Sequence, residues 1–255
     1  MDTSFHLKFV KTALVVGAGH GIGLEIARHI LNKSDANVHC LYSNESRAEE
    51  LFRLQSEYKD RIFSHQVNWL HEETLKEVFS TFKDQNQKFD LVLNAVGVLY
   101  NERLEPEKSL RQVSMEGLTE SFQVNSFLTP LVAKYLRPCL DRKKIVFFAA
   151  LSAMVGSIED NSSGGWYSYR ASKTALNMFV KNISLEFKRS FPASIVLAIH
   201  PGTTNTRLSN PFSKNVKHQI WTSEQTAQHL FEVFESKNVE HTGRFYNWDG
   251  TLIPW

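Results

Sequence analysis

Tyr169 and Lys173, four residues apart in the stretch GGWYSYRASKTALNMF, are the pair of side chains best suited to move a proton. The stretch predicts the start of a helix, on which residues four apart lie on one face. No other tyrosine has a lysine four residues later. A free phenol has a pKa of about 10, and a neighbouring ammonium is expected to lower it toward neutral pH. Tyr169 would then protonate a carbonyl oxygen as hydride reaches the carbon, or accept an alcohol's proton in reverse. Taken alone, the pair also fits an ordinary surface helix.

A second group of interest is the glycine-rich turn VVGAGHGIG, which follows the first expected strand and opens the first expected helix. Gly17, Gly21 and Gly23 fit the spacing G-x-x-x-G-x-G. One glycine permits the sharp turn, another lets backbone N–H groups approach a pyrophosphate, and a third lets the helix pack closely on the strand. A glycine turn without a ligand is the alternative, but this context favours dinucleotide binding. The expected contacts are Gly17, Gly19, His20, Gly21, Ile22 and Gly23.

Two other segments stand at the carboxyl ends of expected strands. Ser152 follows the apolar run KKIVFFAAL, at a place where a hydroxyl can hold a substrate oxygen. The segment NAVG, with Asn94, Ala95 and Gly97, ends another strand where a loop beneath a cofactor is expected. A plain turn at a strand end is the alternative for NAVG.

Strands and helices alternate along the chain and must position these groups. Alternation of this kind predicts a doubly wound parallel sheet of the Rossmann type, with helices on both faces and ligands at the carboxyl ends of the strands. No linker, repeat or low-complexity stretch interrupts the pattern, so residues 1–255 are expected to form a single domain. The expected strands cover residues 12–19, 37–43, 61–67, 89–97, 143–151, 193–202 and 243–250, and the expected helices residues 22–32, 45–58, 71–85, 118–136, the segment ending near 189, and 223–235.

The composition is that of a globular enzyme, with 42% hydrophobic and 22% charged residues. The formal net charge of +2 and the absence of a polybasic run argue against a nucleic-acid binder. We expect no membrane span and no signal peptide, and a cytoplasmic location. Cys40 and Cys139 are too few and too far apart for a disulfide framework or a zinc site, so we expect two reduced, buried thiols and no metal.

Taken together, these motifs resemble the classical short-chain dehydrogenases/reductases. The resemblance rests on Gly17-x-x-x-Gly21-x-Gly23, Asn94-Ala-x-Gly97, Ser152 and Tyr169-x-x-x-Lys173, and it covers essentially the whole chain. The segments VGSIEDNSSGGWYSYRASKTALNMF, HPGTTNTRLSNPF and DGTLIPW are more narrowly similar to the C-factor-like branch, near the carbonyl-reductase type.

The resemblance implies roles for the matching positions. Tyr169 would be the general acid and base, and Lys173 would lower its pKa and bind the nicotinamide ribose. Ser152 would orient the substrate carbonyl, and Asn125 would hold a water of the proton relay. Asn68 stands where relatives carry an aspartate beside the adenine. Contacts to the nicotinamide carboxamide are implied for the segment PGTTNT, namely Pro201, Gly202, Thr203, Thr204 and Thr206.

The sequence also departs from the family pattern. Val16 replaces the usual threonine before the first glycine, and Thr204 replaces a common valine. The insertion IEDNSSGG lengthens the spacing from Ser152 to Tyr169, and Ala153 stands where many relatives have a second serine. Ser152 is the preferred catalytic serine, with Ser157 as the alternative.

The end of the second expected strand, CLYSNES, bears on the choice of cofactor. An acidic residue there would bind the ribose hydroxyls of NAD and repel the phosphate of NADP, but Glu45 comes a little late in the chain. Ser43, Asn44 and Arg47 could instead receive a 2′-phosphate. No arginine directly follows the strand, and His20 replaces the basic residue often found in the glycine turn. NADP(H) is favoured over NAD(H).

We therefore expect an NAD(P)-dependent oxidoreductase that acts on a small-molecule carbonyl or alcohol. The segment at about 203–221 is expected to fold over the substrate, with Leu208, Pro211, Phe212 and Trp221 as an apolar lid. An ordinary surface loop is the alternative. The family commonly assembles as homodimers or homotetramers, so either is open here.

Two rival functions remain. A cofactor-binding protein of cell–cell signalling with little turnover is suggested by the C-factor-like branch. An epimerase or dehydratase is disfavoured, because such relatives carry a larger C-terminal substrate region than the tail after Ser209 offers.

Overall fold

A seven-stranded sheet organises the chain in the computed structural model, which describes residues 3–212 and 219–255. All neighbouring strands pair in parallel, in the order β3-β2-β1-β4-β5-β6-β7. The expected Rossmann-type sheet with about seven strands is therefore confirmed. The strands are β1 (Thr12–Val16), β2 (Asn37–Tyr42), β3 (Ile62–Gln66), β4 (Leu91–Asn94), β5 (Val146–Leu151), β6 (Ser194–His200) and β7 (Arg244–Asn247).

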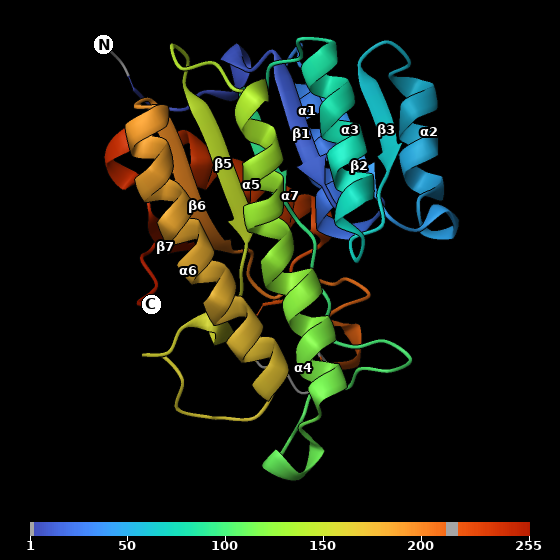
Figure 1. Cartoon of the computed structure of the whole chain (residues 1–255), viewed down its shortest axis with the longest axis vertical. Coiled ribbons are helices and arrows are strands. Elements are labelled where there is room, and N and C mark those ends of the chain that lie inside the picture. Colours follow the sequence, from blue (N-terminus) through green and yellow to red (C-terminus); the bar gives the residue numbers. More distant parts are fainter. Residues whose placement is uncertain (1–2, 213–218) are drawn as a thin grey trace.

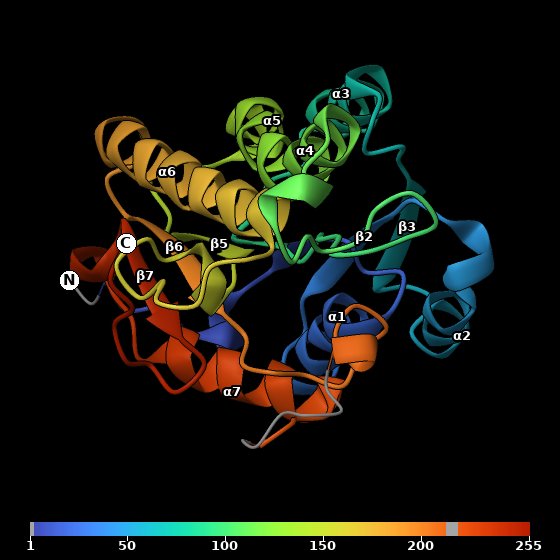
Figure 2. The same ribbon diagram turned by 90° about the horizontal axis from the view of Figure 1, so that it is seen from below.

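Helices cover both faces of this sheet. As Figure 2 shows, α1, α2 and α7 lie on one side, and α3, α4, α5 and α6 lie on the other. The connections between successive parallel strands pass through these helices, as parallel pairing requires. The helices are α1 (Gly21–Lys33), α2 (Glu49–Glu57), α3 (Glu72–Asp84), α4 (Met115–Phe122), α5 (Leu128–Leu136), α6 (Tyr167–Ser190) and α7 (Ser223–Glu235).

The strand β1 shows why the sheet needs two layers of helices. Its five residues are all buried, and successive side chains point to opposite faces. Ala13 and Val15 join the core beneath α1 and α7, whereas Leu14 and Val16 join the core beneath α3, α5 and α6. A strand buried on both sides must therefore be apolar throughout, as its sequence TALVV nearly is.

The expected helix over residues 118–136 is the main difference from the sequence-based assignment. The chain forms α4, then one turn of π-helix over Gln123–Phe127, and then α5 (Figure 1). A π-turn accommodates an extra residue within a helix and is common at functional sites. Its consequence here is the placement of Asn125, described below.

Two other expectations concern membranes and thiols. Within residues 3–212 and 219–255, no helix is long and apolar enough to span a bilayer. Cys40 and Cys139 are both buried and free, and burial raises the pKa of each thiol. Neither cysteine lies in the cavity described below.

A histidine pair near the edge of the sheet predicts a pH dependence of stability. His39 Nδ1 lies 3.1 Å from His65 Nε2, and the ring of His39 packs against Phe63, Phe82 and Phe89. Burial, with a smaller contribution from the charge of His65, lowers the pKa of His39 from 6.5 to about 4. The unfolded chain therefore binds a proton that the folded chain resists. We expect the free energy of unfolding to fall between pH 6.5 and about 4, by up to about 3 kcal/mol from this group.

Urea unfolding at a series of pH values measures this effect. His39→Asn should flatten the slope between pH 6.5 and 4, whereas His71→Asn, at an exposed position, should leave it unchanged. A wild-type slope retained in His39→Asn would contradict the assignment.

Candidate active site

A cavity of about 1040 Å³ lies at the carboxyl ends of β1, β2 and β4. Its walls come from the glycine turn, the end of β2, the loop after β4, the first turns of α4 and the segment after β6. This is the place where an open parallel sheet offers a crevice to ligands. The predicted residues that line it are Gly17, Gly19, His20, Gly21, Ile22, Gly23, Ser43, Asn44, Arg47, Ala95, Gly97 and Thr206.

The glycine turn has the shape of a cradle for a phosphate group. Gly17 has a φ of +89°, and a Cβ there would lie 2.8 Å from Cγ2 of Val96. A Cβ on Gly23 would lie 2.1 Å from the carbonyl oxygen of Gly17, so only glycine lets α1 approach β1 this closely. The helix α1 begins at Gly21 without a side-chain cap from His20. Its first N–H groups and its dipole therefore suit an anion, and these residues fit a dinucleotide pyrophosphate.

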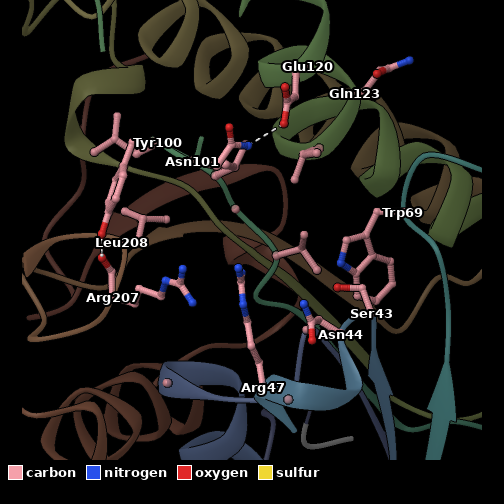
Figure 3. A pocket seen from close by; sticks show the side chains of 18 of the residues that line it. Ser43, Asn44, Arg47, Trp69, Tyr100, Asn101, Glu120, Gln123, Arg207 and Leu208 are labelled. Atoms are coloured by element: carbon pink, nitrogen blue, oxygen red, sulfur yellow. Dashed lines mark hydrogen bonds between the residues drawn. The ribbon is translucent and has the colours of Figure 1, made fainter. Parts of the chain in front are cut away.

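Cationic side chains reach into the cavity from two other segments. Arg47 belongs to the short helix after β2, and Arg207 belongs to the segment after β6. Figure 3 shows both guanidinium groups directed into the same space, with Ser43, Asn44 and Trp69 beside Arg47. Partial burial and the positive charges of Arg47 and Arg207 lower the pKa of His20. This end of the cavity is electropositive and suits a polyanionic ligand.

Two predicted contacts, Asn94 and Asn68, are not among the residues that line the cavity. Asn94 is buried; its amide donates to Thr129 Oγ1 (2.8 Å) and its Oδ1 accepts from Val96 N (3.1 Å), so it shapes the loop after β4. The Oδ1 of Asn68 accepts from the backbone N–H of Leu70 at 3.1 Å.

The segment from Pro201 to Thr204 also lies outside the lining residues. The Thr204 hydroxyl is buried and lies 2.8 Å from the Thr226 hydroxyl on α7. The departure from valine at this position therefore ties the segment to α7. Of the predicted carboxamide contacts, Thr206 is the one that lines the cavity; Pro201, Gly202, Thr203 and Thr204 do not.

Tyr169 and Lys173 lie in the first turns of α6, and both are buried, at 8% and 3% exposure. The Lys173 ammonium lies 5.9 Å from the centre of the Tyr169 ring, so the two side chains share one face of the helix as expected. Lys173 Nζ donates to the carbonyl oxygen of Leu151, at the end of β5, at 2.9 Å. An ordinary surface pair is thus wrong for these residues.

Asn125 joins this pair from the π-turn. Its Oδ1 accepts from Val98 N (2.7 Å), and its amide donates to Val98 O (2.8 Å) and to Ser172 Oγ (3.0 Å). A Cβ on Gly97 would lie 3.4 Å from Lys173 Nζ and 3.5 Å from Asn125 Oδ1. Because Gly97 also lines the cavity, the missing side chain leaves Lys173 and Asn125 next to the cavity wall.

Ser152 is held at the end of β5 by α6. Its Oγ donates to Asn177 Oδ1 at 2.7 Å, and the Asn177 amide donates to Gly156 O at 3.2 Å. The alternative serine, Ser157, instead accepts from the N–H of Asp160 at 3.1 Å, which is the geometry of a local turn. Ser157 thus belongs to a local turn, whereas Ser152 is tied to α6, the helix that carries Tyr169.

An apolar wall surrounds Tyr169. Leu99, Ala153 and Tyr169 form a small buried cluster, against which Tyr100, Val155, Trp166, Leu208 and Phe212 pack. Phe212 contacts Tyr100 and Trp166 with ring centres 5.6 and 5.4 Å apart, and the Tyr100 hydroxyl donates to Arg207 O at 2.6 Å. Leu208 and Phe212, from the first part of the expected lid, thus pack against the cluster that contains Tyr169.

The far end of the expected lid is different. Trp221 packs on Trp248 and His229, away from this wall, and its backbone pairs with Thr203 and Asn205. Trp221 therefore fixes the end of the segment to the body of the protein and does not contribute to the apolar wall around Tyr169. Residues 213–218 of the expected lid lie outside the described residues.

The expected lowering of the Tyr169 pKa is wrong. Burial raises the pKa of Tyr169, and burial also lowers the pKa of Lys173 from 10.5 to about 8. The phenol therefore keeps its proton at neutral pH. No three His, Cys, Asp or Glu side chains gather as a metal site in the described part of the chain.

Several residues of the site were not predicted from the sequence. Trp69, Tyr100 and Arg207 line the cavity, Asn177 holds Ser152, and Glu107 contacts the start of α6. Asn177 follows Lys173 by four residues on the same helical face, so its spacing was a usable signal. The others come from loops, where periodicity gives no signal.

Known proteins share both the sequence pattern and the fold. The sequence model of a family described as short chain dehydrogenase matches residues 11–217. The 1-hydroxy-2-glutathionyl-2-methyl-3-butene dehydrogenase of Rhodococcus sp. (strain AD45) is 27% identical over 247 residues, covering 96% of this chain and 100% of that protein. C-signal of Myxococcus xanthus is 27% identical over 147 residues, covering 58% of this chain and 84% of that protein. The NADPH-bound carbonyl reductase from chicken fatty liver has the same fold, with a TM-score of 0.84 at 22% identity and coverage of 96% and 99%.

Proposed function

This chain belongs to the short-chain dehydrogenase family of oxidoreductases, and from that premise we propose that it transfers hydride between NADP(H) and a small carbonyl or alcohol substrate. The observation that carries the proposal is the position of Tyr169 and Lys173. Both are buried on one face of α6, and Lys173 lies against Gly97 at the wall of the cavity. The substrate would lie between Tyr169 and Ser152, under the apolar wall of Tyr100, Trp166 and Phe212.

Each side chain has a defined task in this proposal. A nicotinamide cofactor, when bound, supplies or accepts the hydride. Tyr169 Oη donates its proton to the carbonyl oxygen during reduction. The Ser152 hydroxyl, which donates to Asn177 Oδ1 in the structure, turns to donate its hydrogen bond to the same substrate oxygen. Lys173 places a positive charge near the phenolate that forms and so favours the transfer. Asn125 keeps the loop after β4 and the first turns of α6 in register through Val98 and Ser172.

The preference for NADP over NAD rests on charge. The end of β2 carries Ser43 and Asn44 where an acidic residue would repel a 2′-phosphate. Arg47 and Arg207 add two guanidinium groups directed into the same part of the cavity (Figure 3). The chicken carbonyl reductase of the same fold was solved with NADPH bound, which agrees with this choice.

Removing the Arg47 guanidinium is expected to weaken NADPH binding at least tenfold, because a charge-assisted hydrogen bond to phosphate contributes about 1.5 kcal/mol or more. NADH binding should change by less than about threefold, since NADH lacks the phosphate. Isothermal titration of wild type and Arg47→Ala with both cofactors measures this. Arg53→Ala is the matched control, because Arg53 is exposed and pairs with Glu49 on α2. Equal affinities of the wild type for NADPH and NADH would defeat the preference.

Turnover decides between an enzyme and a signalling protein that only binds cofactor. Purified protein is supplied with NADPH and a panel of aldehydes, ketones and quinones, and cofactor oxidation is followed at the absorbance of the reduced nicotinamide. We expect oxidation with at least one class. Cofactor binding without oxidation on any substrate would favour a binding role, of the kind suggested by the partial similarity to C-signal.

A further inference from the structure

The start of α6 is held by a carboxylate from a distant loop. Glu107, between β4 and α4, is only 4% exposed although its neighbours in the loop are mostly exposed. Its Oε2 accepts from the backbone N–H of Ser168 at 3.2 Å, and its Oε1 accepts from the Ser168 hydroxyl. Its own backbone oxygen accepts from Trp166 N at 2.5 Å. Three contacts thus join Glu107 to the two residues that flank Tyr167 at the first turn of the helix.

The turn that enters α6 needs such support. Gly164, Gly165 and Trp166 have φ values of +63°, +69° and +49° in succession. A bulky residue in this left-handed region is strained, and the strain persists only where the surroundings fix it. Trp166 is the N-cap residue but gives no side-chain cap to the helix. The carboxylate of Glu107 therefore supplies from another segment the acceptor that an N-cap residue ordinarily provides.

The two residues that Glu107 holds, Trp166 and Ser168, both adjoin Tyr169. Trp166 packs edge-on against Tyr169, with ring centres 6.2 Å apart, and against Phe212. Ser168 immediately precedes Tyr169, so a shift of the first helical turn moves the phenol with it. A buried carboxylate is costly unless N–H and O–H donors and the helix dipole compensate, and all three are present at this position.

We propose that Glu107 is a positioning residue for the reaction, which fixes the first turn of α6 so that the Tyr169 hydroxyl and the Trp166 wall face the substrate. The inference rests on the proposed role of Tyr169. Glu107 acts through Trp166 and Ser168, and it lies outside the lining of the cofactor cavity. Its removal should therefore change the chemical step and leave cofactor binding intact.

Three variants separate positioning from general stability. Glu107→Ala removes the acceptor, and Glu107→Gln keeps the size and can retain both contacts to Ser168. Glu105→Ala is the matched control, because Glu105 is exposed in the same loop. We expect Glu107→Ala to lower kcat about tenfold or more at an unchanged Kd for NADPH, since small misplacements of a catalytic group cost 10- to 100-fold. Glu107→Gln should stay within about threefold of wild type, and Glu105→Ala should equal it.

Hydrogen exchange gives a readout independent of turnover. In Glu107→Ala, amides of residues 166–170 should exchange faster, while those of β5 and β6 should not. If Glu107→Ala folds poorly, Ser168→Ala removes one of the contacts and should lower kcat about threefold with the same local exchange change. A kcat equal to wild type in both alanine variants, or a loss of kcat matched by an equal loss of cofactor affinity, overturns the proposal. A wild type without turnover defeats the proposed function instead, and local exchange then still tests the Glu107 contact.

Discussion

Tyr169→Phe is expected to lower kcat for carbonyl reduction by about 10²- to 10⁴-fold, the usual contribution of a positioned general acid. The change removes one oxygen and keeps the ring that packs against Trp166 and Leu99. Folding and the Kd for NADPH should therefore be unchanged. Steady-state kinetics with the best carbonyl substrate and titration with NADPH measure the two quantities.

The same helix provides the control for this substitution. Tyr167→Phe removes a hydroxyl two residues earlier, from a side chain that is 36% exposed, and should leave kcat unchanged. The direction of the reaction should also respond to pH. Because burial raises the pKa of Tyr169, the donor form persists at neutral pH and favours reduction, whereas alcohol oxidation needs the phenolate and should rise with pH. A Tyr169→Phe variant with more than a tenth of wild-type kcat would remove the central claim.

Lys173→Met is expected to remove most activity, by about a hundredfold or more, and yet to make the protein slightly more stable at pH 7. Burial lowers the pKa of Lys173 from 10.5 to about 8. Below pH 8, keeping the charged ammonium buried therefore lowers the free energy of unfolding by about 3 kcal/mol. Leaving the carbonyl oxygen of Leu151 without its donor costs about 1 to 3 kcal/mol in the variant. The expected net gain is about 1 kcal/mol.

The pH dependence makes this prediction specific. Between pH 8 and 10.5 the wild type should gain stability, because the unfolded chain still binds the proton that the folded chain has released, and Lys173→Met should not gain it. The order of stability should then reverse between about pH 8 and 9, because a gain of about 1.4 kcal/mol per pH unit soon exceeds the difference of about 1 kcal/mol. Lys181→Met is the control, because Lys181 is exposed on the same helix and also donates to a carbonyl oxygen, that of Gly243. If the free energy of unfolding of wild type and of Lys173→Met depended on pH in the same way, burial of the Lys173 ammonium would not destabilise the fold.

The alternation of strands and helices was predictable because the central strands β1, β4, β5 and β6 are buried on both faces and so read as mostly apolar runs. The placement of Tyr169 and Lys173 on one face of α6 was predictable for a similar reason, since four-residue spacing on a helix is a local property of the sequence. The expected boundaries of the strands extended into the loops after them, as for residues 89–97, where β4 covers only Leu91–Asn94. Apolar character continues beyond the last ladder hydrogen bond, so composition alone does not mark the end of a strand.

The contacts between distant segments were not predictable in this way. Glu107 meets Ser168 across 61 positions, and Tyr100 meets Arg207 across 107. Neither pair has a periodic signal, because loops follow no fixed repeat. The contact of Thr204 was also not predictable from the sequence. The family resemblance placed this residue near a cofactor, but its hydroxyl contacts the Thr226 hydroxyl on α7. The raised pKa of Tyr169 was missed because burial, which the sequence pattern does not measure, outweighs the nearby lysine.

The π-turn at Gln123–Phe127 has an evolutionary consequence. Such a turn absorbs one additional residue while the flanking helices keep their faces, so α4 and α5 would tolerate losing it. Deletion of one residue there would convert the π-turn into regular α-helix. The carboxamide of Asn125 would then move away from Val98. A lineage could thus rearrange the site proposed for proton transfer in a single genetic event and still inherit the glycine turn unchanged.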